Sequence, residues 1–162
     1  MFFCYTDGSC KSGNEGAPGG WGFCIKKPDG TTLEGHGAAT KTLSKVMEIT
    51  AVAEALAALP EGAEATVFSD SQSLVESCKR KLDAWKRQEG LGKVDPEIVE
   101  NVRRIASLAV EKRLSLTWQW IRGHHGNAGN ERADELATQG AREAKAALQA
   151  EEEAARKKAG NG

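Results

Sequence analysis

The sequence lacks any long apolar segment. No apolar run approaches the roughly 18 residues that a membrane-spanning helix requires. The first residues, Met1 to Asp7, carry no basic region ahead of an apolar stretch and reach an acidic residue at once, which is unlike a signal peptide. We therefore expect neither export nor insertion into a membrane.

Cysteines are few and are not spaced like metal ligands. None of the four belongs to a Cys-x-x-Cys pair, and Cys4 and Cys24 fall within apolar segments, where free thiols pack well. No cysteine lies near His124 and His125, so a zinc site is not indicated. A reduced, cytoplasmic location is the resulting expectation.

An excess of positive charge is also absent. The formal net charge is -1, which argues against a protein that holds nucleic acid by bulk charge alone. The cations are unevenly distributed, however, because residues 79–93 contain six basic and two acidic side chains. Such a stretch is either a solvated helix face or a surface that contacts phosphates.

The length and composition predict one globular domain. A chain of 162 residues can bury a core of its own but leaves little room for a second domain. Apolar residues make up 40% and charged residues 28% of the chain, as in ordinary globular proteins, and no internal repeat is visible. Composition alone therefore assigns no function.

Apolar periodicity and turn residues predict an α/β order of elements. Strands are expected at residues 2–6, 21–27, 31–37, 65–69 and 115–121, with Gly13 to Gly22 bending the chain after the first. Helices are expected at 44–59, at 71–88, from Asp95-Pro96 onward and at 130–158, the last fraying beyond Ala147 and followed by a disordered end from Gly160. Three antiparallel strands would thus open a mixed sheet that helices cover.

Two aspartates follow similar buried strands. Tyr5-Thr6-Asp7-Gly8 and Phe68-Ser69-Asp70-Ser71 share the order aromatic, hydroxyl, aspartate, small residue at the carboxyl end of an apolar run. In open α/β sheets, functional sites gather at that edge. Taken singly, Asp7-Gly8 could form a turn and Asp70 could cap the following helix. Their equivalent positions favour a shared site.

Glu48 lies on the apolar side of its predicted helix. At about 100° per residue it aligns with Val52, Ala55 and Leu59. A lone carboxylate on a core face costs several kcal/mol unless it is paired or bound to metal. The alternatives are therefore a salt bridge, for example to Lys45, or a functional site.

Asp134 lies near the start of the last predicted helix, among small residues that would let a ligand or another backbone approach. A favourable interaction with the helix dipole is the alternative explanation. If Asp134 joins the other three carboxylates, their mutual repulsion calls for a hard divalent cation. Magnesium suits such a set better than zinc does.

Five short motifs occur in an order that resembles type 1 ribonuclease H. They are Thr6-Asp7-Gly8-Ser9-Cys10 with the glycine-rich loop after it, Met47-Glu48, Ser69-Asp70-Ser71-Gln72, Trp120-Ile121-Arg122-Gly123-His124-His125-Gly126, and Asn130-Glu131-Arg132-Ala133-Asp134. Each is weak alone, but together they span about residues 2–142. The resemblance implies a ribonuclease H-like fold, with a five-stranded mixed sheet, over a catalytic domain at 1–145 and a helical extension at 146–162.

The resemblance also implies an activity. Such enzymes cut the RNA strand of RNA–DNA hybrids with two Mg²⁺ ions, for which Mn²⁺ can substitute, and leave 5′-phosphate and 3′-hydroxyl ends. By carry-over, Asp7 would bridge both ions, Asp134 would hold the ion on the nucleophile side, and Glu48 and Asp70 would hold the other. His124 would assist proton movement or product release. The partner is then the hybrid, and a monomer is expected.

Residues that contact the hybrid are also expected from the resemblance. Asn14 would lie in the minor groove, where the RNA 2′-hydroxyl distinguishes the strands, and the basic stretch would grip the DNA strand with a single aromatic. The full set is Asn14, Ser44, Ser71, Lys81, Trp85, Lys86 and Arg87. One departure is clear: Leu43-Ser44-Lys45-Val46 stands where relatives commonly carry Thr-Asn-Asn-Arg.

Two other functions fit parts of the pattern. A catalytically silent hybrid-binding module would have lost at least one carboxylate, and none is lost. A nuclease of the same fold that acts on DNA would keep all four, because the carboxylates alone do not choose a substrate. His124, Asn14 and the basic stretch favour the ribonuclease.

Overall fold

A computed structural model of the chain describes residues 1–11, 16–123 and 126–160. It contains one five-stranded sheet in the order β3-β2-β1-β4-β5. β1 pairs antiparallel with β2, and β2 with β3, whereas β4 runs parallel to both β1 and β5. The strands are β1 (Phe2–Cys10), β2 (Ala17–Lys26), β3 (Thr32–Thr42), β4 (Glu64–Ser69) and β5 (Ser115–Trp120). The expected mixed sheet with three antiparallel strands is confirmed.

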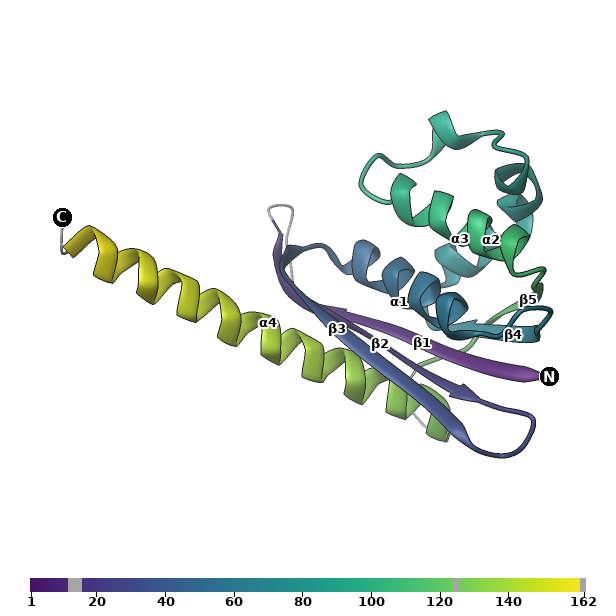
Figure 1. Cartoon of the computed structure of the whole chain (residues 1–162), viewed down its shortest axis with the longest axis horizontal. Coiled ribbons are helices and arrows are strands. Elements are labelled where there is room, and N and C mark those ends of the chain that lie inside the picture. The colour runs from purple at the N-terminus through teal and green to yellow at the C-terminus, as the bar shows by residue number, and fades with distance from the viewer. Residues whose placement is uncertain (12–15, 124–125, 161–162) are drawn as a thin grey trace.

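Helices cover both faces of the sheet, as Figure 1 shows. α1 (Ser44–Ala58) packs on β1 and β2, and α2 (Gln72–Lys86) and α3 (Val99–Glu111) lie on the same side, joined by a short 3-10 helix at Leu91–Lys93. α4 (Ala128–Gly160) packs alone against the other face of β1, β2 and β3. The sheet is therefore the middle of three layers.

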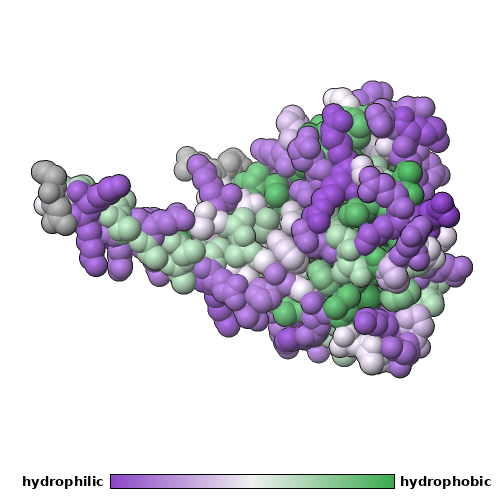
Figure 2. Space-filling view, viewed as in Figure 1, coloured by the Kyte–Doolittle hydropathy of each residue, from purple (hydrophilic) through white to green (hydrophobic). Residues whose placement is uncertain are grey.

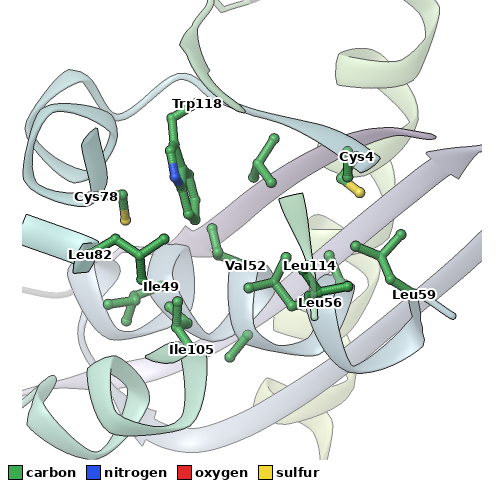
Figure 3. Close-up of a cluster of buried hydrophobic side chains, with 14 of the residues drawn as sticks. Cys4, Ile49, Val52, Leu56, Leu59, Cys78, Leu82, Ile105, Leu114 and Trp118 are labelled. Carbon is green, nitrogen blue, oxygen red and sulfur yellow. The ribbon is translucent and has the colours of Figure 1, made fainter. Parts of the chain in front are cut away.

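The main hydrophobic core lies between the sheet and α1 (Figure 3). Val52 and Leu56 on α1 are fully buried and share this cluster with Ile105 of α3 and Trp118 of β5. The apolar stripe predicted for residues 44–59 is thus the buried face of α1. Its burial fixes the rotation of the helix that carries Glu48.

One helix starts within a residue of its expected position, and another starts later than expected. α2 begins at Gln72 with Ser71 as its N-cap, because the Ser71 hydroxyl accepts a hydrogen bond from the amide of Leu74 at 3.4 Å. α3 begins at Val99 rather than at Asp95-Pro96. The Asp95 carboxylate instead accepts the amide hydrogen bond of Glu97 at 3.1 Å, which closes a turn ahead of the helix.

Three strands are longer than the sequence pattern predicted, and one of them is β3, which continues past the predicted end at residue 37 to Thr42. β1 continues through Asp7 and Gly8 to Cys10, and β2 begins at Ala17, so residues 17–22 extend the sheet where a bend was expected. The glycines of β2 explain the error, because they weaken a strand pattern in the sequence. In the fold these glycines allow α4 to pack closely against β2. A Cβ on Gly22 would lie 2.6 Å from the Ala137 nitrogen, and one on Gly20 would contact the backbone of Ala141.

α4 extends well beyond the sheet. Its last buried residue is Ala144, and the helix then continues through largely exposed alanine and charged residues to Gly160, beyond the predicted fraying point at Ala147. Figure 2 shows hydrophilic residues interspersed with moderately hydrophobic ones along this projecting part. Across the described ranges, no helix has the length and apolarity needed to cross a membrane.

We predict that Gly22→Ala destabilises the protein. The new methyl group would clash with the α4 backbone, so the free energy of unfolding should fall by about 1–3 kcal/mol. Urea denaturation followed by circular dichroism measures the change. Gly92→Ala is the matched control, because a Cβ there meets nothing within 4 Å; equal losses in the two variants would contradict the close approach of α4.

Candidate active site

Asp7 and Asp70 lie at the same level of two adjacent parallel strands. β1 and β4 pair from Phe2 opposite Ala65 to Tyr5 opposite Phe68, so each aspartate comes two residues after the last pair. The Thr6 hydroxyl donates a hydrogen bond to the Phe68 carbonyl at 2.9 Å and ties the strands together there. β4 ends at Ser69 while β1 continues, which opens the sheet beside Asp7.

The first turns of α1 bring Glu48 to this opening. Gly8 makes the approach possible, because a Cβ on Gly8 would lie 2.5 Å from the Glu48 nitrogen and 2.7 Å from the Met47 carbonyl carbon. Any larger residue at position 8 would push α1 away from β1. Glu48 itself is half-buried, and its carboxylate lies within electrostatic reach of Asp70 and accepts a hydrogen bond from the Ser71 hydroxyl.

α4 brings Asp134 to the opposite side of β1. The helix begins at Ala128, so Asp134 lies in its second turn, and neighbouring Ala133 packs against Gly22, the strand partner of Asp7. The carboxyl groups of Asp7 and Asp134 share a hydrogen bond. The structure thus gathers all four predicted carboxylates around the opening, with Asp70 as the common neighbour of Asp7 and Glu48.

The electrostatics of the group reflect burial and mutual repulsion. Burial, then the charge of Asp70 and the hydrogen bond and charge of Asp134, raise the pKa of Asp7 to about 8, although the amide of Gly8 stabilises its anion. Burial, followed by the charge of Asp70, also raises the pKa of Glu48, against the hydrogen bond from Ser71. The electrostatics of Asp7 and Glu48 are therefore dominated by burial and by the neighbouring carboxylates.

The donor set has the chemistry of a site for a hard divalent cation. Its four carboxylates offer the oxygen ligands that such a cation prefers. In the described part of the chain, no three metal-ligating side chains stand close enough together to surround one ion. Ligation would therefore need rotation of these side chains.

The alternative explanations for individual residues do not match the structure. Asp7-Gly8 lies inside β1 rather than in a turn, and Ser71 rather than Asp70 caps α2. Lys45 pairs with Asp95 at 2.6 Å and Glu97 at 2.5 Å instead of with Glu48. These local alternatives therefore do not account for Asp7, Asp70 or Glu48.

A positioning contact on Asp70 is absent from the sequence prediction. The indole nitrogen of Trp120, at the end of β5, donates a hydrogen bond to the Asp70 carbonyl at 3.1 Å. Gly123 lies beside the same aspartate, since a Cβ there would come within 3.3 Å of Oδ2. Trp120 and Gly123 belong to one of the five sequence motifs, and in the fold both lie against Asp70.

The basic stretch splits into exposed cations and one buried aromatic. Lys81 is exposed and lines a cavity of about 280 Å³ that also includes Glu48 and Ser71. Trp85, by contrast, is 4% exposed and belongs to the hydrophobic core. The expected contact between Trp85 and nucleic acid is therefore wrong for this conformation, because helical periodicity turns its ring inward while Lys81 and Arg87 remain at the surface.

The other residues predicted to contact nucleic acid differ in exposure and in ion pairing. Ser44 is the exposed first residue of α1, Lys86 lies 3.9 Å from Asp83, and Arg87 pairs with Glu89 at 3.2 Å. His36 pairs with Glu143 of α4. The proposed roles of Asn14 and His124, and the position of His125, fall outside the described residues.

Comparison with known proteins identifies the family. The sequence model of the RNase H family matches residues 1–142. The chain belongs to the ribonuclease H family. Ribonuclease H of Polaromonas naphthalenivorans (strain CJ2) is 42% identical over 139 residues, which cover 84% of this chain and 84% of that protein.

Solved structures agree with this ribonuclease H assignment. LC11-RNase H1, solved in complex with an RNA/DNA hybrid, is 26% identical with a TM-score of 0.67, over 89% of this chain and 99% of that one. The prototype foamy virus protease-reverse transcriptase is 28% identical with a TM-score of 0.71, over 86% of this chain and 20% of the viral one. The fold is therefore that of ribonuclease H.

We predict that Asp7→Asn removes a pH dependence from the stability of the metal-free protein. Folding raises the pKa of Asp7 from 3.8 to about 8. The contribution of Asp7 to the free energy of unfolding is therefore fully present below about pH 4 and is lost as the pH rises through about 8. Near pH 9 the variant should exceed wild type in free energy of unfolding by at least about 1.4 kcal/mol, equivalent to one pKa unit.

Urea denaturation in a chelating buffer near pH 5, 7 and 9 measures this difference. Asp83→Asn serves as the control, because Asp83 is exposed and its substitution should leave the pH dependence unchanged. Parallel pH profiles for Asp7→Asn and wild type would contradict the repulsion that the geometry implies.

We predict that Trp85→Ala acts on stability rather than selectively on nucleic-acid binding. Because Trp85 is a core residue, the free energy of unfolding should fall by about 3–5 kcal/mol. Thermal unfolding measures this loss, with Lys86→Ala as the neighbouring control near zero. A Trp85→Ala protein with wild-type stability and weakened hybrid binding would restore the original expectation.

Proposed function

We propose that this protein is an endonuclease that hydrolyses the RNA strand of RNA–DNA hybrids. The observation that carries the proposal is the convergence of Asp7, Glu48, Asp70 and Asp134 at the point where β4 ends beside β1. The relatives named ribonuclease H support the activity. The hybrid bound to LC11-RNase H1 supports the substrate.

The family is generally dependent on divalent metal ions. The four carboxylates would hold two Mg²⁺ ions here, with Mn²⁺ able to substitute. When bound, such ions would supply an activated water and stabilise the leaving 3′ oxygen. Asp7, whose carboxyl group interacts with those of Asp70 and Asp134, would contribute to holding both ions, Asp134 would help hold one of them, and Glu48 with Asp70 would hold the other.

The chemical step is a hydrolysis with simple balance. The water oxygen forms a bond to phosphorus, and the bond from phosphorus to the 3′ oxygen breaks. The leaving oxygen takes a proton to become the 3′-hydroxyl, and the phosphate remains on the 5′ end of the other fragment. His124 would assist proton movement or product release at this stage.

The chain's own residues would set the geometry of this reaction. Trp120 holds the Asp70 backbone, and Ser71 orients the Glu48 carboxylate. Ser44 and Lys81 lie near the Glu48 side, where they would meet the substrate, with Lys86 and Arg87 further along. Asn14 would read the minor groove of the hybrid.

The catalytic domain would comprise residues 1–145, and residues 146–162 would form an extension. The family match to residues 1–142 and the last buried position of α4 at Ala144 support this division. A cytoplasmic location and a monomeric state stay predictions of the sequence.

Cleavage of end-labelled substrates tests the function. We expect purified protein with Mg²⁺ to cut the RNA strand of a hybrid and to leave duplex DNA and duplex RNA intact. Asp70→Asn should keep the fold and lower the rate at least about 100-fold, as loss of a transition-state electrostatic group does. Asp83→Asn is the control of equal charge change and should retain wild-type activity.

Two results would reject parts of the proposal. Equal cutting of duplex DNA by wild type would favour a DNA nuclease of the same fold. Full activity in Asp70→Asn, with circular dichroism showing a native fold, would remove Asp70 from the metal site.

A further inference from the structure

Beyond the carboxylates, β1 carries polar side chains along the face that Asp7 uses. Residues of a strand alternate between its faces. Gly8 points toward α1, where its Cβ would meet Glu48, whereas Tyr5 points toward α4, where its ring contacts Gly129. Asp7 and Ser9 therefore share the α4 side, and Lys11, just after the end of β1, lies about 13 Å beyond Asp7 along the chain.

α4 runs beside this part of β1 in the same direction. Ala133 and Ala137 lie against Gly22, the partner of Asp7, and Ala137 and Ala141 lie against Gly20, the partner of Ser9. Asp134, Thr138, Arg142 and Lys145 follow one another at intervals of three or four residues, and such positions share a helix face. Arg142 and Lys145 lie about 12–17 Å along the helix from Asp134.

These two rows border one cavity of about 580 Å³. Lys11, Arg142 and Lys145 line it together with Ser9, Thr138 and apolar groups that include Pro18 and Leu148. The three cations are exposed, and none forms an ion pair within 4 Å with a carboxylate of the described residues. Among the described residues of the lining, Glu152, at the far end, is the one acidic residue.

Arg142 differs from most arginines of the described residues. Arg80, Arg87, Arg103, Arg104, Arg113 and Arg132 each have an acidic partner within 4 Å, whereas Arg142 has none among the described residues. Three unpaired cations around an open groove attract a polyanion. Ser9 and Thr138, which also line the groove, follow Asp7 on β1 and Asp134 on α4.

We propose that this groove, defined by Lys11, Arg142 and Lys145, binds the sugar–phosphate backbone of the hybrid on one side of the scissile bond. The proposal rests on the function proposed above and extends its contact surface to α4. At about 3.4 Å of helix rise per nucleotide of one strand, the cations would meet phosphates about four or five steps from the reacting one. The apolar floor would pack against the sugars.

Binding at equilibrium provides the test. A fluorescently labelled RNA–DNA hybrid is titrated with full-length protein in a chelating buffer, which prevents cleavage, at several salt concentrations. Lys11→Ala/Arg142→Ala/Lys145→Ala should raise Kd about tenfold or more near 0.1 M salt. The slope of log Kd against log salt should fall by about two to three, one for each lost phosphate contact.

The control variant leaves the residues of the groove unchanged. Lys26→Ala/Lys27→Ala changes cations at the opposite end of β2, near the pairing of Lys26 with Phe3, and should alter Kd and the salt slope little. Single variants Arg142→Ala and Lys145→Ala replace exposed helix residues with the strongest helix former and keep the test open if the triple variant unfolds. Circular dichroism confirms the fold of each.

Hybrids shortened from either end show on which side of the scissile bond the groove binds. Shortening the hybrid from one end should weaken wild type but not the triple variant, whereas shortening from the other end should weaken both equally. With Mg²⁺, the triple variant should show raised KM and nearly unchanged kcat on the long hybrid, because it leaves the carboxylates intact.

Three outcomes overturn the proposal. They are a wild-type Kd and salt slope in the triple variant, an equal effect in the control variant, and equal sensitivity of wild type and variant to both truncations. Failure of wild type to cut the hybrid would reject the proposed function instead. Because the binding experiment needs no cleavage, the two failures are distinguishable.

Discussion

The close approach of two helix backbones to one pair of strands is the constraint on which this structure depends. α1 reaches β1 at Gly8, and α4 reaches β2 at Gly22, with room for no Cβ at either contact. Because Asp7 lies between these points, directly before Gly8 and opposite Gly22, both helices deliver their acidic residues to it. Larger side chains would separate Glu48 and Asp134 from the strands.

This arrangement conflicts with stability. The carboxylates repel one another and are partly desolvated, which raises the pKa of both Asp7 and Glu48. Neighbouring acidic groups elsewhere on the surface are neutralised: Glu54 pairs with Arg104, and Asp95 with Lys45. Carboxylates with raised pKa values gathered at one opening are typical of a functional site, and their oxygens suit a hard cation.

The nucleic-acid surface differs from the one that the resemblance implied. Lys45, within the departure at Leu43 to Val46, joins the start of α1 to Asp95 and Glu97, so this segment acts partly in packing the region before α3. Trp85 also belongs to the core. Backbone contacts would therefore depend more on cations, both on the α2 side and along the groove beside α4.

Local patterns in the sequence predicted the order of the elements, the mixed sheet and the four acidic residues that the fold brings together. Apolar periodicity marked Glu48 as misplaced, and matched strand ends marked Asp7 and Asp70, because these signals are local. The sequence-based prediction missed the start of β2, because glycines weaken a strand pattern. It also placed Trp85 at the surface, because the side of α2 on which a residue lies depends on how the helix packs.

The folded arrangement alone shows which residues that are distant in the sequence lie side by side. The direction in which α4 runs along β1 places Arg142 and Lys145 beside Lys11, although more than 100 positions separate them. No sequence period connects a strand to a distant helix. Their proximity follows from glycine contacts that set the helix on the sheet, and such contacts exist only after the chain has folded.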